Sequence, residues 1–290
     1  MEQTRFLFSA FADEIDADFD KQLEALGKLG IPMLELRGVN GKSFTALTDD
    51  EVKEVGEKLQ KAGIRLSSLG SPIGKIDVTS DFEAHKALLT RIMDIGDMLD
   101  CKRIRMFSFY PADLDRQAFE ERVFAWMEEL LDMASARGFV LCHENEKDIY
   151  GCSPEEELAL MQHFDGRLRV VLDPGNFAFC KLDASKGYPL LKDYIEYFHI
   201  KDADEEGIIV PPGKGVAHLE DIMKSVVEDR PGETVILTME PHLMVFDGLS
   251  SLSKLDDIKH KYTFASPFEA FSTAYEAAKA MAVRAGAKVN

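Results

Sequence analysis

The stretch RGFVLCHEN, residues 137–145, shows the pattern that decides the fold. Gly138 closes a segment with helical periodicity, because the residue just past a helix often needs the left-handed conformation that glycine adopts most easily. A short β-rich run, VLCH, follows at once and ends in Glu144. The same order recurs at Gly30 before MLELR and at Gly63 before RLSSLG. The chain is therefore built of repeated strand-and-helix units.

Working outward from this stretch, we find eight strand candidates separated by helical segments. They are Phe6–Ser9, Met33–Arg37, Arg65–Leu69, Arg103–Ser108, Val140–Glu144, Arg169–Asp173, Tyr197–Lys201 and Val235–Glu240. Alternating strands and helices predict a parallel sheet, and eight units suit closure into a barrel. The segment after the first strand lacks the glycines of a dinucleotide-binding loop, which argues against an open doubly wound sheet. We predict a (β/α)8 TIM barrel that covers residues 1–290 as a single domain.

Composition and charge narrow the class of function. The chain has 290 residues, of which 46% are hydrophobic and 30% charged, as in a soluble globular protein. No apolar run is long enough to span a bilayer and the N-terminus lacks the features of a signal peptide, so we expect a cytoplasmic protein without a membrane partner. The net charge of −18 argues against a nucleic-acid partner. The four cysteines form no CxxC pair, so we expect reduced thiols.

Four consecutive strands, the fifth to the eighth, end in a potential metal ligand: Glu144, Asp173, His199 and Glu240. A single carboxylate at such a position often caps the next helix, and a single histidine is more often a hydrogen-bonded neutral residue. Four of them at one rim of a barrel would be costly without a cation, since buried charges must be paired or coordinated. We therefore predict a divalent metal site. Three carboxylates and one imidazole favour Mn²⁺ or Mg²⁺, with zinc and cobalt as alternatives.

Five motifs surround these residues: HEN (143–145), LDPGN (172–176), FHIKDA (198–203), PxGxG (211–215) and MEPH (239–242). Through them the chain resembles the xylose isomerase-like sugar phosphate isomerase/epimerase superfamily. The resemblance implies a TIM barrel in which Glu144, Asp173, His199 and Glu240 bind the metal. It also implies that Glu144 and Glu240 face opposite sides of the substrate as base and acid.

The resemblance implies a metal-dependent isomerase or epimerase of a sugar or sugar phosphate. Removing a proton α to a carbonyl creates an enediolate, whose charge a bound metal stabilises. Two carboxylates can then remove and redeliver the proton. One alternative is an inosose-type dehydratase, which abstracts the same proton and expels hydroxide. The other is a catalytically inactive sugar-binding barrel, although the complete ligand set argues against it.

At several positions the sequence differs from that of known members of the superfamily, and these differences narrow the choice among its subgroups. Free-ketose 3-epimerases of this superfamily carry Glu, His and Arg where this chain has Tyr150, Asn176 and Glu205. These differences count against the free-ketose epimerases. Val216 follows the PxGxG motif where many relatives have an acidic or amide residue, so we assign no substrate contact to that loop. DNA-repair endonucleases of the same fold use more histidines than this chain offers.

Four further residues are candidates for substrate binding. Lys201 shares a strand face with His199 and could hold a substrate oxygen or form a salt bridge with an acid. Arg37 ends the second strand, with Glu35 on its face, and could contact substrate or form an ion pair. Lys75 lies in a loop that should cross the active face and would suit a phosphate. His242 follows the last strand, where it could support a ligand. The long loop 241–265 is expected near the active site, and outer helices could pair in a homo-oligomer.

Overall fold

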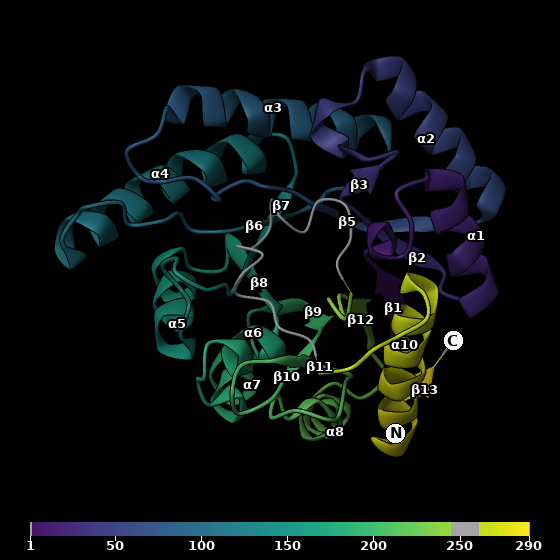
Figure 1. Cartoon of the computed structure of the whole chain (residues 1–290). Helices are drawn as coiled ribbons and strands as arrows, with labels where there is room; N and C mark the ends of the chain where they lie inside the picture. The colour runs from purple at the N-terminus through teal and green to yellow at the C-terminus, as the bar shows by residue number, and fades with distance from the viewer. Residues whose placement is uncertain (1, 245–260, 290) are drawn as a thin grey trace.

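The fold is built on one curled parallel sheet, described here from a computed structural model that covers residues 2–244 and 261–289 (Figure 1). Its nine strands are β1 (Arg5–Ala10), β2 (Met33–Leu36), β5 (Arg65–Gly70), β6 (Arg103–Met106), β7 (Val140–Glu144), β8 (Leu168–Leu172), β9 (Ile195–Ile200), β12 (Thr234–Met239) and β13 (Lys288–Val289). The strand order is β13-β1-β12-β9-β8-β7-β6-β5-β2. Strands β1 and β2 pack against each other, so the sheet curls into the predicted TIM barrel. The eight predicted strands are all confirmed, with ends that differ by a few residues.

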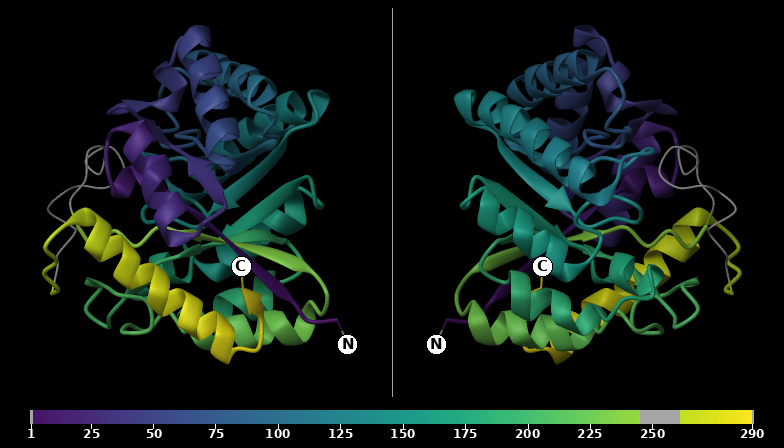
Figure 2. Two further views of the ribbon diagram at one scale, coloured as in Figure 1. Left: turned by 90° about the vertical axis from the view of Figure 1, so that its right-hand side faces the viewer. Right: turned by 90° about the vertical axis from the view of Figure 1, so that its left-hand side faces the viewer.

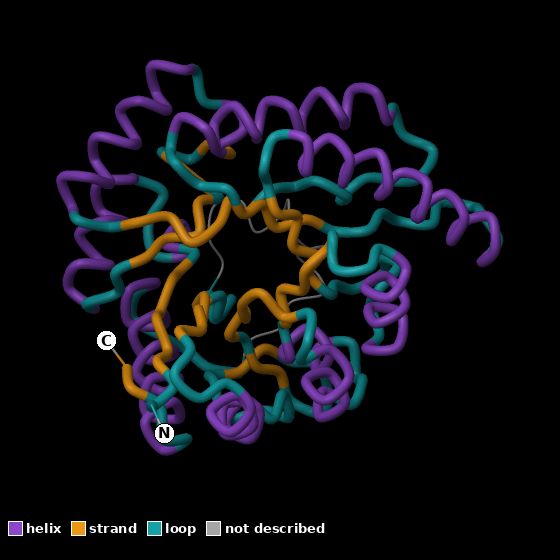
Figure 3. Tube along the Cα trace, turned by 180° about the vertical axis from the view of Figure 1, so that it is seen from behind, coloured by secondary structure: helices purple, strands orange, loops and turns teal. Residues whose placement is uncertain are grey.

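Helices cover the outside of the sheet, and the strands surround the barrel axis (Figure 3). The helices are α1 (Phe19–Leu29), α2 (Asp49–Ala62), α3 (Phe82–Met98), α4 (Arg116–Ala136), α5 (Pro154–His163), α6 (Pro174–Phe179), α7 (Gly187–Leu191), α8 (Leu219–Asp229) and α10 (Pro267–Arg284). Short 3-10 turns occur at η1 (Ala12–Glu14), η2 (Phe44–Ala46) and η3 (Ala184–Lys186). Both termini lie at the same end of the barrel (Figure 2), where the Lys288 amide donates to the Thr4 carbonyl at 2.9 Å.

The local signals in the sequence account for the helix boundaries. The Thr48 hydroxyl accepts from the Glu51 amide, and the Glu51 carboxylate accepts from the Thr48 amide, which completes a capping box at the start of α2. Gly30 and Gly63 end α1 and α2 in the left-handed conformation, with φ of 69° and 68°. In the part of the chain that the structure describes, no helix is both long and apolar enough to cross a membrane.

The barrel interior changes from apolar to polar along its axis. One layer of interior side chains forms a small apolar cluster: Leu7, Met33, Cys142, Val171, Tyr197 and Ile236. Further along the strands, toward their carboxyl ends, the buried side chains include Glu35, Arg105 and His199. The apolar cluster lies closer to the amino ends of the strands and packs next to this buried polar region. Most of the remaining hydrophobic core lies between the sheet and the helices.

Two antiparallel hairpins lie at the carboxyl ends of the strands. The first joins β3 (Gly38–Val39) to β4 (Lys42–Ser43), and the second joins β10 (Asp202–Ala203) to β11 (Ile209–Val210). In the loop after β11, the amides of residues 213, 215 and 217 all donate to the Asp202 carboxylate, which fixes the PxGxG motif. Residues 245–260 of the long loop expected near the active site lie outside the described residues.

Candidate metal centre

The four predicted ligands converge at the carboxyl ends of β7, β8, β9 and β12. Glu144 is the last residue of β7, Asp173 follows β8, His199 lies one residue before the end of β9, and Glu240 follows β12. One ligand atom from each residue lies within 4.8 Å of those of the other three, and all four residues are buried. Parallel strands therefore bring together side chains that are up to 96 positions apart, as the difference between residues 144 and 240 shows.

His199 presents one ring nitrogen to the other ligands. Its Nδ1 lies 3.1 Å from Glu144 Oε1 and 3.3 Å from Glu240 Oε2. Its Nε2 lies 3.1 Å from Glu35 Oε2, on the other side of the ring. His199 Nδ1, Glu144 Oε2 and Asp173 Oδ2 are fully buried, and their contacts among the described residues are ion pairs with charged neighbours. Carboxylate oxygens and an imidazole nitrogen collected at one buried point fit a bound cation.

Three cationic side chains surround the carboxylates. Lys201 Nζ lies 2.9 Å from Asp173 Oδ2 and 3.1 Å from Glu240 Oε2. Arg37 Nη1 donates to Glu240 Oε1 at 2.9 Å. Arg105 Nη1 lies 3.4 Å from Glu144 Oε2. Each cation holds a candidate ligand in place from outside the cluster.

Comparison with known families identifies the barrel. The model of the xylose isomerase-like TIM barrel family matches residues 23–255, which is most of the chain and includes all four converging residues. The chain belongs to the xylose isomerase-like TIM barrel family. No curated protein matches the sequence at a significant level.

Solved structures show the same barrel fold at low sequence identity. A D-allulose 3-epimerase from Methylomonas sp. has a TM-score of 0.71 at 19% identity, with 97% of this chain and 100% of that chain covered. A xylose isomerase-like TIM barrel protein from Mycobacterium smegmatis, in complex with magnesium, has a TM-score of 0.67 at 17% identity, covering 96% of both chains. A probable 3-DHS dehydratase from Bacillus anthracis has a TM-score of 0.67 at 14% identity, covering 83% of this chain and 92% of that chain.

Acidic side chains outnumber cationic ones around the ligand cluster of this xylose isomerase-like barrel. Besides the three carboxylates of the cluster, the buried acids Glu35, Asp13 and Glu14 belong to the same network. Burial raises the pKa of Glu14 to about 8. Three cations, Lys201, Arg37 and Arg105, oppose these acids. Among the described residues the six acids therefore outnumber the three cations, and a divalent cation would offset part of this acidic excess.

Without metal, bound protons offset part of this acidic excess. Burial alone would lower the pKa of His199, yet the carboxylates of Glu144 and Glu35 raise it well above its usual value. Burial raises the pKa of Asp173 to about 7, against the opposing effect of the Lys201 ammonium. Burial would raise the pKa of Glu240 as well, but Lys201 and the other neighbouring cationic groups hold it well below its usual range. In the metal-free site His199 therefore carries protons on both ring nitrogens. Below neutral pH the Asp173 carboxyl group is protonated as well.

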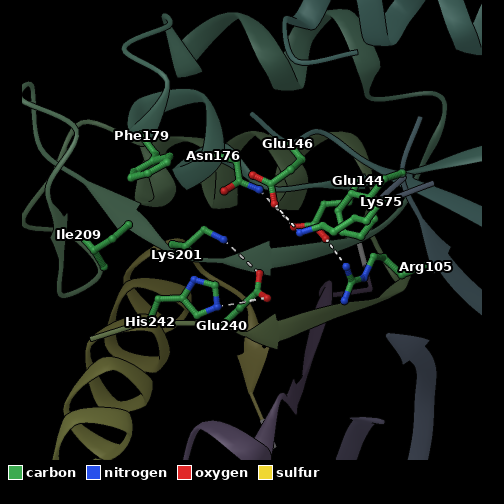
Figure 4. Close-up of a pocket in the computed structure, with 11 residues that line it drawn as sticks. Lys75, Arg105, Glu144, Glu146, Asn176, Phe179, Lys201, Ile209, Glu240 and His242 are labelled. Atoms are coloured by element: carbon green, nitrogen blue, oxygen red, sulfur yellow. Dashed lines mark hydrogen bonds and ion pairs between the residues drawn. The ribbon is translucent and has the colours of Figure 1, made fainter. Parts of the chain in front are cut away.

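The structure places the four predicted substrate-binding residues in two groups. Lys201, Lys75 and His242 line the pocket over the ligands, and Figure 4 shows Lys201 and His242 pointing toward Glu240. His242 Nε2 lies 3.5 Å from Glu240 Oε1, and burial lowers the pKa of His242 to about 4, so its imidazole is neutral. Lys75 Nζ pairs with Glu146 Oε2 at 3.1 Å.

Arg37 belongs to the second group, and it forms an ion pair, one of its two predicted roles. Its guanidinium donates two hydrogen bonds to Asp13, at 2.9 and 3.0 Å, besides the one to Glu240. The acids that pair with Arg37 come from η1 and from the end of β12. A second cavity of about 290 Å³, lined partly by Arg37 and Asp13, shares Lys75, Arg105 and Phe107 with the pocket over the ligands.

Arg105 is part of the site but was not among the residues predicted from the sequence. Its side chain is 2% exposed in the interior of the barrel, and its guanidinium lies 4.5 Å from the ring centroid of Phe107. The sequence does contain an indication of its role. Arg105 lies inside the strand RIRM, and an arginine in a strand that is buried on both faces needs an acidic partner. Asn176 was noted only as a departure from ketose epimerases, yet its Nδ2 donates to Glu144 Oε1 at 3.2 Å.

Proposed function

We propose that this protein is a metal-dependent isomerase or epimerase that acts on a sugar or sugar phosphate by removing a proton α to a carbonyl. The observation that carries the proposal is the convergence of four buried ligand atoms, within 4.8 Å of one another, at the carboxyl ends of four neighbouring strands. Mn²⁺ and Mg²⁺ suit the oxygen-rich donor set best. The magnesium complex of the Mycobacterium smegmatis relative supports a metal of this kind.

In this proposal Glu144 and Glu240 transfer the proton. They come from β7 and β12, which are separated in the sheet by β8 and β9, so the two carboxylates reach a bound substrate from different sides. Burial raises the pKa of Glu144, but the charges of His199 and Arg105 lower it to about 2, so this carboxylate is ionised in the metal-free site. A divalent ion at the cluster would supply positive charge beside the substrate oxygens as the enediolate forms.

Other side chains would bind and orient the substrate. Lys201 lies against both Asp173 and Glu240, so its ammonium is placed to donate to a substrate oxygen beside the reacting carbons. Lys75 and His242 line the same pocket, and the adjoining cavity of about 290 Å³ gives room for the part of the substrate that does not react. The D-allulose 3-epimerase among the similar structures supports a polyhydroxy ketone as the substrate class.

The test is solvent deuterium incorporation into a panel of ketoses, ketose phosphates and inososes, with and without Mn²⁺. We expect Mn²⁺-dependent exchange at a carbon α to the carbonyl. Glu144→Gln and Glu240→Gln should each slow this exchange by about 10²- to 10⁴-fold, the usual contribution of a positioned acid or base. Glu205→Gln, at an exposed loop position, is the matched control and should react like the wild type.

The outcomes separate the candidate functions. If the substrate loses water in place of exchanging deuterium, the protein is a dehydratase. The probable 3-DHS dehydratase among the similar structures is the reason to test for this outcome. Binding of a sugar with no exchange under any metal would mean an inactive barrel. Equal exchange by the wild type and both glutamine variants would contradict the assigned roles.

A further inference from the structure

Glu35 is a fully buried carboxylate that lies next to the ligand cluster and is not part of it. It sits in β2 and is 0% exposed. The Tyr197 hydroxyl donates to Glu35 Oε1 at 2.8 Å, and Glu35 Oε2 lies 3.1 Å from His199 Nε2. Arg105 Nε lies 4.0 Å from Oε1. Among the described residues, Glu35 thus joins one candidate ligand, His199, to Tyr197 in the apolar cluster and to Arg105 beside Glu144.

The contact with Glu35 determines which nitrogen of His199 keeps its proton when a cation occupies the cluster. A neutral imidazole has one N–H and one lone pair, and carboxylates face both of its nitrogens here, so a cation beside Glu144 and Glu240 would take the place of the proton at Nδ1 and leave the N–H at Nε2, where Glu35 accepts it. With the proton on Nε2, the lone pair is on Nδ1, the nitrogen that faces Glu144 and Glu240. Glu35 therefore fixes both the tautomer and the direction of the ring.

The backbone supports this placement of Glu35. In the pairing of β2 with β5, Leu34 lies opposite Leu66 but Glu35 lies opposite Ser68, so the register shifts between Leu34 and Glu35. The extra residue is Ser67 of β5, so the local bend lies in the strand beside Glu35. A buried carboxylate would be costly here without partners, and the three contacts above meet that need.

We propose that Glu35 is a positioning residue for the metal centre: it holds His199 in the tautomer and orientation that present Nδ1 to a divalent ion. This inference rests on the proposed function, because it assumes that His199 binds a metal. Carboxylates that accept from a metal-binding histidine raise its basicity as a ligand, and their loss typically weakens metal binding by about 10- to 100-fold.

The test measures the Mn²⁺ affinity of the full chain by chelator competition for the wild type and Glu35→Gln. Glutamine keeps the shape of the side chain but is neutral, and its amide can present either an acceptor or a donor to Nε2, so it no longer enforces the tautomer with the N–H on Nε2. We expect the variant to fold and to bind Mn²⁺ about 10- to 100-fold more weakly. The matched control is Glu157→Gln, since Glu157 is equally buried and lies 2.7 Å from His143 Nδ1, outside the ligand cluster.

The expected pattern is a weakened Mn²⁺ affinity in Glu35→Gln and an unchanged one in Glu157→Gln, whatever either variant does to thermal stability. A folded Glu35→Gln variant that binds Mn²⁺ like the wild type would overturn the inference. Should that variant not fold, Tyr197→Phe decides in the same way, because it removes the hydroxyl that fixes Glu35. A wild type that binds no Mn²⁺ would refute the proposed function instead, and so the two failures are distinct.

Discussion

Binding of Mn²⁺ should release protons, and their number should change between pH 6 and pH 8. Metal coordination requires a deprotonated carboxylate and a free imidazole lone pair. In the metal-free protein the pKa of His199 lies well above its usual value, so His199 loses one proton on binding at either pH. Burial raises the pKa of Asp173 to about 7, so this group contributes a second proton only below neutral pH.

The expected numbers follow from that pKa. At pH 6 a carboxyl group with a pKa of about 7 is roughly nine-tenths protonated, so we expect release of about two protons for each Mn²⁺. At pH 8 the same group is roughly one-tenth protonated, and the release falls to about one. The apparent dissociation constant should accordingly fall by about 100-fold per pH unit below pH 7 and by about 10-fold per unit above it.

The assay is calorimetric titration with Mn²⁺ in two buffers of different ionisation enthalpy at each pH. The difference in heat between the buffers counts the protons released. Asp173→Asn is the control, because an amide cannot carry the second proton, so any remaining binding should release about one proton at both pH values. No proton release by the wild type, or an equal number at pH 6 and pH 8, would refute this description of the ligands.

Two further substitutions test other parts of the structure. Lys201→Met should destabilise the metal-free protein to denaturant by about 3–5 kcal/mol, because it leaves buried carboxylates without their cation, and Mn²⁺ should restore part of the loss. A variant as stable as the wild type without metal would contradict this. Gly215→Ala should lower the free energy of unfolding by at least about 1–3 kcal/mol, because the added Cβ would lie 2.2 Å from the Ala203 carbonyl oxygen. Gly27→Ala, in an open helical position, should raise stability by about 0.5–1 kcal/mol, and equal effects of the two changes would count against the Gly215 argument.

The sequence was sufficient to predict the barrel and the four converging residues. Glycines at helix ends and short β-rich runs mark the units locally, and parallel strands carry their carboxyl ends to one face. Glu144, Asp173, His199 and Glu240 each stand at such an end, so their convergence needed no knowledge of side-chain packing. The hairpin Gly38–Ser43 was not predicted, because its short strands carry no strong periodic signal.

The network around the ligands was harder to predict. Arg37 was expected to contact substrate or pair with an acid, but Asp13 and Glu14 lie in a 3-10 turn more than twenty residues earlier, and only the folded chain brings them to it. Glu35 stood in the sequence as a neighbour of Arg37 on one strand face, whereas its partners are Tyr197 and His199. Such pairings depend on strand register across the barrel, which one-dimensional patterns do not contain.

The central claim is that one divalent ion binds at the point where these four side chains meet. The most direct measurement is the titration of chelator-treated protein with Mn²⁺, with the free ion followed by electron paramagnetic resonance. We predict one saturable site per chain in the wild type and none in a double variant that carries Glu144→Gln and Glu240→Gln. A wild type that leaves all of the Mn²⁺ free, or a double variant that binds it as tightly, would contradict the account.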